Sequence, residues 1–207
     1  MQNKKKIAVF ASGSGTNFIN IYNNLKNGQI VLLISNNPSS GAVKFAIQKS
    51  IDYDIINSFK YPNPNDLNKQ YELVLKYYKV ELILLAGFIK KIPINLIKIF
   101  KNKIINIHPS LLPKFGGKGF YGIKVHESVI KSRDRITGAT IHFVNEQYDK
   151  GLIIMQKKIK VHDNDTPNSL SKRVLKIEYE LYLEVVGLLC DNKIKIIDNK
   201  VEINDRN

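Results

Sequence analysis

The chain has 207 residues, a mass of 23.6 kDa and a formal net charge of +14 at pH 7. That length is typical of one domain and disfavours a second catalytic or binding domain. No stretch reaches the roughly 18 uninterrupted apolar residues that a membrane helix needs, and the basic start leads into a strand-like segment without a signal-peptide core. We therefore expect a cytoplasmic protein without membrane contacts, and its single cysteine, Cys190, excludes a disulfide framework.

The positive charge has two explanations. A basic surface neutralises nucleic-acid phosphates, but 28 of the 32 basic residues are Lys and only 4 are Arg. Ile (30), Lys (28) and Asn (22) have A/T-rich codons and together make up 80 of the 207 residues, so compositional bias also accounts for the charge. Arg, which phosphate and base contacts favour, is scarce. We expect no specific nucleic-acid partner, although a non-catalytic nucleic-acid-binding module stays open on charge alone.

The first half alternates apolar runs with segments of helical periodicity. Residues 7–11 (IAVFA) run into the glycine turn, residues 12–17 (SGSGTN), after which apolar residues recur at helical spacing. Further strands are predicted at residues 30–35, 53–56, 82–86 and 104–107, and helices at 43–48, 66–78 and 93–100. The alternation predicts an α/β fold: a Rossmann-like open, mostly parallel sheet with helices on both faces.

The second half has a different pattern. A glycine loop, residues 113–122, precedes a predicted helix at residues 125–131. Two strands, residues 139–144 and 152–161, are joined by a turn at residues 149–151, which predicts an antiparallel pair. A long amphipathic helix (166–189) and a hairpin (193–203) follow. No repeat or linker marks a boundary, so we expect a single domain over residues 1–207.

The glycine turn is a candidate phosphate-binding site. Its backbone amides open the first helix, where unpaired donors and the helix dipole favour an anion. It lacks the dinucleotide-binding pattern, since Phe18 stands three residues after Gly15 and the second strand ends without a carboxylate. No Gly-Lys-Ser/Thr follows, which excludes a nucleoside-triphosphate loop. We favour a phosphomonoester substrate; the alternative is a simple strand-to-helix turn.

The end of the strand at residues 104–107 presents two polar side chains. Alternation along a strand sends Asn106 and His108 to the same side. In open parallel sheets, ligands bind at the carboxyl ends of the strands, so an amide and an imidazole stand where a site is expected. A lone histidine beside an apolar strand is more often structural, and its pairing with Asn106 is what favours function.

Four segments together resemble phosphoribosylglycinamide formyltransferases, the folate-dependent enzymes of purine synthesis. They are residues 85–88 (LAGF), 106–114 (NIHPSLLPK), 138–144 (GATIHFV) and 149–151 (DKG). The resemblance implies a formyltransferase fold that uses 10-formyltetrahydrofolate as co-substrate and glycinamide ribonucleotide as substrate, acts without a metal, and is a monomer or homodimer. It divides the chain into a phosphate-binding half, residues 1–103, and a catalytic and folate-binding half, residues 104–207.

The resemblance also assigns residues to roles. It makes Asn106, His108 and Asp149 the catalytic cluster, with Thr140 supporting them. Substrate binding is assigned to Gly13, Ser14, Gly15, Thr16, Asn17 and Glu178. The folate pocket is assigned to Phe88, Ile89, Lys90, Lys91, Ile92, Asn106, Phe143, Val144, Asn145 and Glu146.

These roles fit the chemistry of formyl transfer. An oxyanion develops in a tetrahedral intermediate, and Asn106 and protonated His108 would stabilise it. We expect Asp149 to raise the pKa of His108 and, with a bound water, to help carry protons. His142 is left outside the catalytic cluster, and His126 and His162 are expected at the surface.

Two other enzymes share the Asn-x-His-Pro-Ser-Leu-Leu-Pro core. Methionyl-tRNA formyltransferase ordinarily carries a further tRNA-binding domain, which 207 residues do not accommodate. Formyltetrahydrofolate hydrolase carries an additional N-terminal regulatory domain, and here the glycine turn begins near residue 12. Both stay as alternatives to formyl transfer onto glycinamide ribonucleotide.

Overall fold

The structure is a computed structural model, which describes residues 4–204. The chain forms two compact units divided between Ile105 and Asn106. The division falls within strand β5, Ile104–His108. Within the described range, no helix is both long enough and apolar enough to cross a membrane.

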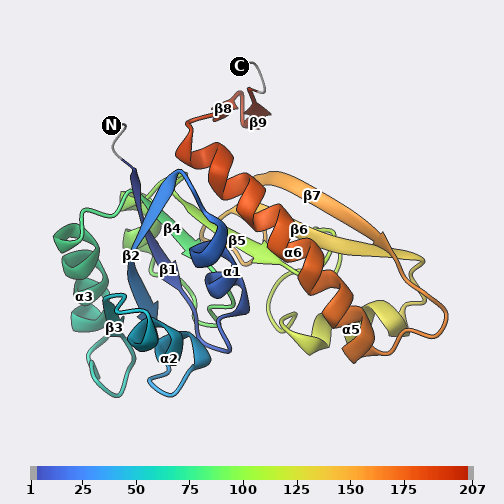
Figure 1. Cartoon of the computed structure of the whole chain (residues 1–207), viewed down its shortest axis with the longest axis horizontal. Coiled ribbons are helices and arrows are strands. Elements are labelled where there is room, and N and C mark those ends of the chain that lie inside the picture. The colour runs from blue at the N-terminus through green and yellow to red at the C-terminus, as the bar shows by residue number, and fades with distance from the viewer. Residues whose placement is uncertain (1–3, 205–207) are drawn as a thin grey trace. The chain divides into compact units, whose positions relative to one another are not determined.

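The first unit is built on a parallel sheet. Its complete strands are β1 (Lys5–Phe10), β2 (Gly28–Ser35), β3 (Tyr53–Ile55) and β4 (Leu82–Leu85). They follow the order β3-β2-β1-β4, with β5 next to β4, and β1 pairs in parallel with both β2 and β4. The helices are α1 (Thr16–Asn24), α2 (Gly41–Gln48), α3 (Pro64–Tyr77) and α4 (Ile94–Ile99), drawn in Figure 1.

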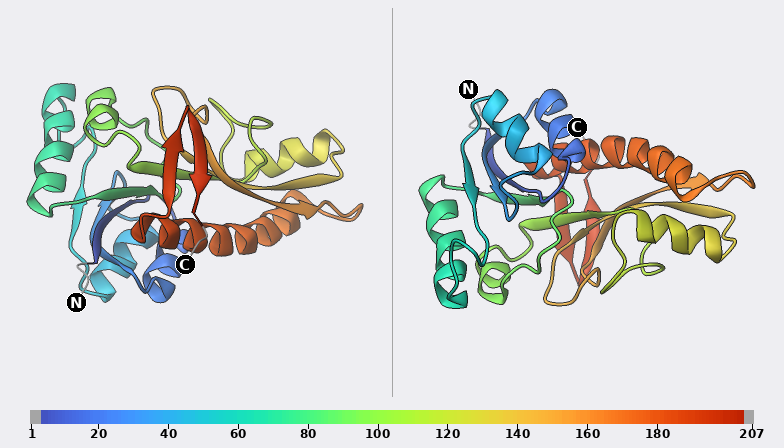
Figure 2. Two further views of the ribbon diagram at one scale, coloured as in Figure 1. Left: turned by 90° about the horizontal axis from the view of Figure 1, so that it is seen from above. Right: turned by 90° about the horizontal axis from the view of Figure 1, so that it is seen from below.

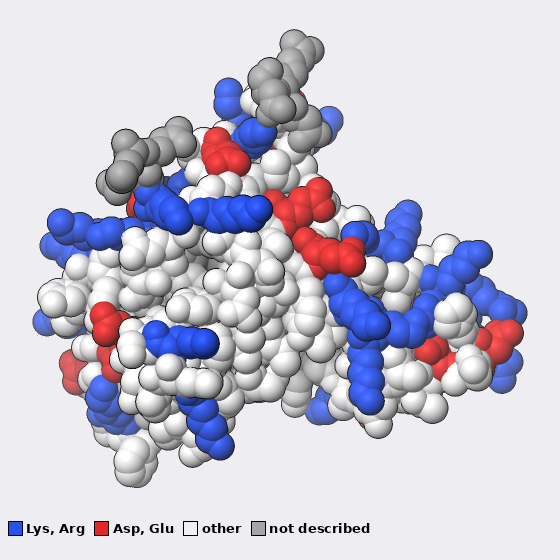
Figure 3. Space-filling view, viewed as in Figure 1, with Lys and Arg blue, Asp and Glu red and all other residues white. Residues whose placement is uncertain are grey.

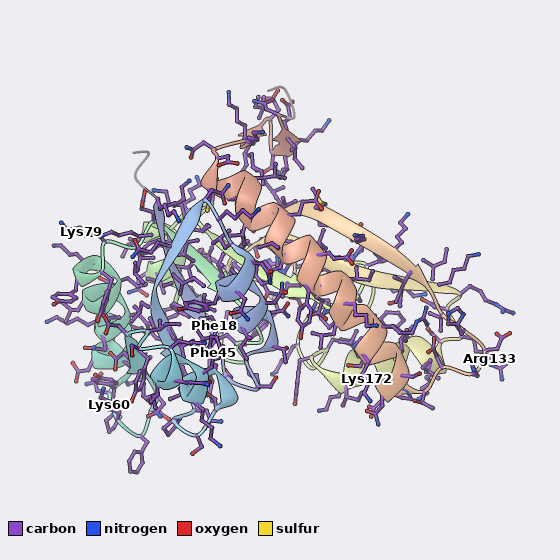
Figure 4. All side chains as sticks on the ribbon, viewed as in Figure 1. Phe18, Phe45, Lys60, Lys79, Arg133 and Lys172 are labelled. Carbon is purple, nitrogen blue, oxygen red and sulfur yellow. The ribbon has the colours of Figure 1, made fainter. Side chains whose placement is uncertain are left out.

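Helices cover both faces of this sheet. Figure 2 shows α1 and α2 on one face, and α3 and α4 on the other. The strands are accordingly apolar along their length, and residues 7–10 of β1 have no exposed surface. On the first face, the ring of Phe18 in α1 meets that of Phe45 in α2 edge to face, with 5.4 Å between the centroids (Figure 4). Burial on two sides explains why these strands read as continuous apolar runs.

The second unit combines the end of β5 with an antiparallel pair. Helix α5 (Ile123–Lys131) is followed by β6 (Ile136–Phe143), which pairs antiparallel with β7 (Ile153–Lys160). The long helix α6 (Pro167–Cys190) packs on both β6 and β7. The antiparallel strands β8 (Ile194–Ile197) and β9 (Lys200–Ile203) form the final hairpin.

The predicted fold class is confirmed, and every predicted helix and strand is present. The main difference in bounds is at β6, which begins at Ile136 rather than at residue 139. The pairing with β7 extends to Ile136 opposite Lys160, and Val161 N–H donates to the carbonyl of Arg135. The ladder therefore continues past the apolar run by which the strand was recognised.

Candidate active site

The glycine turn joins β1 to α1 in the first unit. Gly15 stands at the N-cap of α1 with φ of +77°, and no side chain caps the helix. A Cβ at Gly15 would lie 2.8 Å from Cα of Ala42, and one at Gly41 would lie 2.7 Å from the carbonyl oxygen of Ser14. Only glycines allow the turn and the start of α2 to pack this closely. The result is a helix N-terminus whose amides are not capped by a side chain.

The glycine turn is tied to the segment that follows β4. The hydroxyl of Ser12 accepts a hydrogen bond from Ile89 N–H at 3.1 Å and donates to the side-chain oxygen of Asn36. The Ser12 N–H donates to the carbonyl of Gly87 at 3.2 Å. Within the first unit, the predicted phosphate-binding turn thus adjoins one predicted wall of the folate pocket, residues 88–92, of which Ile89 is 60% exposed.

The second unit brings the three residues of the catalytic cluster together. Asn106 and His108 lie at the end of β5, and Asp149 lies in the β6–β7 connection with φ of +55°. The Nδ1 atom of His108 is 3.6 Å from Oδ2 of Asp149. The other carboxylate oxygen, Oδ1, is 3.5 Å from Nε2 of His142, which in turn lies 3.1 Å from Nδ2 of Asn106. His142 therefore connects the amide of Asn106 to the carboxylate of Asp149.

Both ring nitrogens of His108 face acceptors. Nε2 is 2.7 Å from the carbonyl oxygen of Phe115, and Nδ1 faces Asp149. Burial nevertheless lowers the pKa of His108 below its ordinary value, and nearby His142 lowers it too, against the opposite effects of Asp149 and the Phe115 carbonyl. Asp149 does raise the pKa of His108, as expected, but the net shift is downward, because the cost of burying the charged ring exceeds the attraction of the carboxylate. The resting imidazole is weakly basic.

Asp149 is held as a carboxylate. Burial raises its pKa, but the His142 side chain, His108 and a backbone N–H together bring it below its usual value. That N–H belongs to Gly117 and donates to Oδ2 at 2.8 Å. Asp149 thus accepts from the glycine loop while facing two imidazoles.

The glycine loop lies against the catalytic cluster. It supplies the Phe115 carbonyl to His108 and the Gly117 N–H to Asp149. A Cβ on Gly116 would lie 2.4 Å from Cδ2 of Leu112 and 3.2 Å from Cβ of Asp149. The backbone of this loop therefore contacts the side chains of both His108 and Asp149.

The hydroxyl of Thr140 holds the segment that follows β5. Its buried hydroxyl donates to the carbonyl of Ser110 at 2.6 Å and accepts from Leu112 N–H at 3.0 Å. The side-chain amide of Gln156 also donates to it, at 2.8 Å. These bonds hold the backbone that leads from β5 into the glycine loop, which fits a supporting role.

The remaining predicted binding residues differ in how exposed they are. Five of them belong to the second unit. Glu178 is on α6 and only 9% exposed. Phe143 is buried at the end of β6, Val144 is partly buried, and Asn145 and Glu146 are exposed. In the first unit Lys90 and Lys91 are exposed and Ile92 is buried.

Sequence reasoning missed two histidines. His142 is a member of the site, and its period-two spacing from Thr140 on one strand was the signal that could have found it. The prediction that His126 lies at the surface is wrong: it is 2% exposed on α5, and its Nδ1 is buried without a partner in the described structure. Burial, together with His108, lowers its pKa to about 4. His162 is exposed, as predicted.

Metal-type side chains do not gather in the described structure. Among residues 4–204, no three His, Cys, Asp or Glu side chains are placed so that they could hold a metal ion.

The site combines an amide and an imidazole at the end of β5 with a carboxylate from the β6–β7 connection, and it agrees with the family comparison. Residues 5–186 match the formyl transferase family, and the chain belongs to that family. It is 47% identical over 198 residues to a chloroplastic phosphoribosylglycinamide formyltransferase from Arabidopsis thaliana, covering 93% of this chain and 68% of that protein. A Vigna unguiculata protein of the same name is 44% identical over 197 residues, covering 92% and 62% respectively.

Solved structures agree with the sequence relatives. The crystal structure of glycinamide ribonucleotide transformylase 1 from Symbiobacterium toebii superposes with a TM-score of 0.90 at 28% identity, covering 99% of this chain and 96% of that one. The resemblance drawn from the four sequence segments is thereby confirmed, as is the formyltransferase fold.

Proposed function

We propose that this protein transfers the formyl group of 10-formyltetrahydrofolate to the primary amine of glycinamide ribonucleotide in purine biosynthesis. The relatives that match most of the chain carry the name of this activity. The observation that carries the proposal for this chain's own residues is the cluster of Asn106, His108 and Asp149, with 3.6 Å between His108 Nδ1 and Asp149 Oδ2.

The lowered pKa of His108 suits it to act as a base. Near neutral pH the resting ring is largely neutral, so it can take a proton from the attacking amine through a water held together with Asp149. The imidazolium formed then has an acceptor at each nitrogen, Asp149 at Nδ1 and the Phe115 carbonyl at Nε2. Its charge also stabilises the oxyanion of the tetrahedral intermediate, together with an N–H of Asn106. The proton finally passes to the folate nitrogen that leaves.

Substrate recognition is assigned to both units. The turn at residues 13–17 opens α1 without a side-chain cap and suits the phosphate of the ribonucleotide, because the positive end of the helix dipole favours an anion. Glu178 is proposed to hold the same substrate. For the folate, we propose residues 88–92 together with Asn106 and residues 143–146.

The location in the cell and the oligomeric state stay predictions. The cytoplasmic location rests on sequence alone, and both plant relatives are named chloroplastic. Cell fractionation with a tagged chain tests the first, and light scattering of the purified protein distinguishes a monomer from a homodimer.

The decisive experiment compares three acceptors with one donor. Purified protein is given 10-formyltetrahydrofolate with glycinamide ribonucleotide, with methionyl-tRNA, or with neither. We expect rapid formylation of the ribonucleotide and loss of that activity in His108→Ala. Faster transfer to methionyl-tRNA would indicate the methionyl-tRNA enzyme, and equal consumption of the folate without an acceptor would indicate the hydrolase.

A further inference from the structure

The imidazole of His142 is held in one tautomer by its own strand. It is 2% exposed, and its Nδ1 lies 2.8 Å from the carbonyl oxygen of Phe143. A carbonyl oxygen only accepts, so Nδ1 must carry the proton. In the neutral ring, Nε2 then has a lone pair and no proton, and only the imidazolium could donate from Nε2 to Asp149.

That lone pair determines which atom of the Asn106 amide faces His142. Nε2 is 3.1 Å from Nδ2 of Asn106, a distance that fits an N–H donating to a ring nitrogen. If the amide were turned by 180°, its oxygen would face the Nε2 lone pair, and two acceptors would meet in a buried place. The Nδ1–H tautomer of His142 thus favours one of the two amide orientations.

The amide orientation matters because only one of its two ends can stabilise an oxyanion. Nδ2 has two hydrogens; one is used by His142, and the other is left to donate, whereas Oδ1 would repel a negative charge. We infer that His142 is a positioning residue for formyl transfer: as the neutral Nδ1–H tautomer it fixes the amide of Asn106 with an N–H, rather than the carbonyl oxygen, available to the reacting formyl group. This inference rests on the proposed function.

The backbone that holds His142 is itself constrained. A Cβ at Gly151 would lie 1.7 Å from the carbonyl oxygen of Phe143, so this position must be glycine for that carbonyl to stay where His142 needs it. Phe143 N–H also donates to the carbonyl of Leu152 at 2.9 Å. The turn that places Asp149 in the cluster therefore also holds the acceptor that selects the tautomer of His142.

Asp149 is the other group that faces Nε2 of His142, at 3.5 Å from Oδ1. A role through Asp149 is the competing explanation for any effect of His142 on catalysis. The two explanations differ in which double variant shows coupling, because residues that act through one another have non-additive effects.

The kinetic test is a pair of double-mutant cycles. We expect His142→Leu to lower kcat on the order of tenfold to a hundredfold, with the KM of each substrate changed less than about threefold. In an Asn106→Ala background, His142→Leu should have no further effect on kcat, while in an Asp149→Asn background its effect should persist. The reverse pattern, or full additivity with Asn106→Ala, overturns the inference.

Two further measurements separate positioning from a structural role. His142→Gln puts an amide oxygen near the place of Nε2, so it should restore kcat to within about fivefold of the wild type; rescue that fails in a folded variant counts against the inference. His162→Leu, at an exposed histidine, is the control and should leave kcat unchanged. Imidazole ¹⁵N NMR of the whole protein should find the proton of His142 on Nδ1, and a proton on Nε2 alone would overturn the inference. Because this measurement needs no substrate, its result does not depend on the proposed function.

Discussion

The electrostatics of the site depend on how deeply single residues are buried. His108 lies between two acceptors, Asp149 and the carbonyl of Phe115, yet burial keeps its pKa below the ordinary value. The free energies of the neutral ring and the imidazolium thus differ less than they would if only burial, or only the two acceptors, acted on the ring. A group in this balance both accepts and returns a proton readily near neutral pH.

Replacing Asp149 should shift this balance in one direction. Because Asp149 raises the pKa of His108 against the effect of burial, Asp149→Asn should lower it further. The acid limb of the kcat profile, where protonation removes the base, should then move to lower pH, and maximal kcat should fall on the order of a hundredfold or more. The pH dependence of kcat in both proteins measures this.

Double variants test whether Asn106, His108 and Asp149 act as a unit. Asn106→Ala combined with His108→Ala should lower kcat by much less than the product of the single effects. An unmoved acid limb in Asp149→Asn, together with strictly multiplicative double variants, would remove the mechanism.

His126 should make the stability of the fold depend on pH. Its pKa is about 4 in the folded chain and near 6.5 when unfolded, so between these values the unfolded state binds a proton that the folded state does not. The free energy of unfolding should therefore fall by about 1.4 kcal/mol per pH unit as the pH drops from about 6.5, and this loss should level off below about pH 4.

Urea unfolding at pH 7 and pH 5 measures this effect. The difference between the two pH values should shrink in His126→Gln and stay unchanged in His162→Gln, whose side chain is exposed in the wild type. If the wild type and His126→Gln lost equal stability, His126 would have to be protonated in the fold.

At the scale of elements, the glycine turn packs closely against the start of α2 and is the proposed site for the substrate phosphate. Gly15→Val should disrupt it, because the residue has φ of +77° and a Cβ would lie 2.8 Å from Cα of Ala42. Gly13 has open space around the position of a Cβ, so Gly13→Val adds bulk without a clash inside the protein. Both variants should raise the KM for the ribonucleotide at least tenfold, since hydrogen bonds to a charged group contribute about 1.5–3 kcal/mol.

The two variants should differ in stability. Gly15→Val should lower Tm, whereas Gly13→Val should leave it nearly unchanged, and the KM for the folate should stay within about twofold in both. Loss of folate binding with ribonucleotide binding intact would show that the turn serves the other substrate.

Elements were predictable here because the sheet of the first unit is buried on both faces. Its strands are short apolar runs, and caps such as Asn63 and Thr166 mark the starts of helices. The strand-end pair of Asn106 and His108 followed from alternation alone. Whether a single polar residue is buried depends on tertiary packing, which local sequence patterns do not show. For this reason His126 was predicted at the surface, and the pKa of His108 was expected to rise rather than fall.

The contact between His142 and Asn106 also could not be predicted from the sequence. The two residues are 36 positions apart, on different strands, and their distance depends on how β5 and β6 are placed. Alternation along a strand indicates to which face of the sheet the side chain of His142 points. It does not indicate which residue of the neighbouring strand the side chain contacts.

At the scale of the whole molecule, the net charge of +14 comes from 32 basic and 18 acidic residues. On the face drawn in Figure 3, blue basic side chains are interspersed with red acidic ones and with uncharged surface. Two of the four arginines are held by acidic partners: Arg135 lies 3.0 Å from Asp163, and Arg173 pairs with Asp165. An exposed pair such as Arg135 and Asp163 contributes little to stability, but both pairs lower the local positive potential.

We therefore predict that the protein has no specific nucleic-acid site. Lysine-rich surfaces bind phosphates through counterion release, so its affinity for an initiator tRNA should fall steeply as salt rises from about 50 to about 200 mM, the range in which such contacts lose several orders of magnitude. A random RNA of equal length should bind equally well, because discrimination needs base contacts, and only four arginines are present, two of which are already paired with acidic side chains. Fluorescence anisotropy across this salt range measures both affinities, with formylation of the charged tRNA followed in parallel. Tight binding to the initiator tRNA that survives about 150 mM salt, accompanied by tRNA-dependent formylation, would contradict the prediction and assign the positive charge a function of its own.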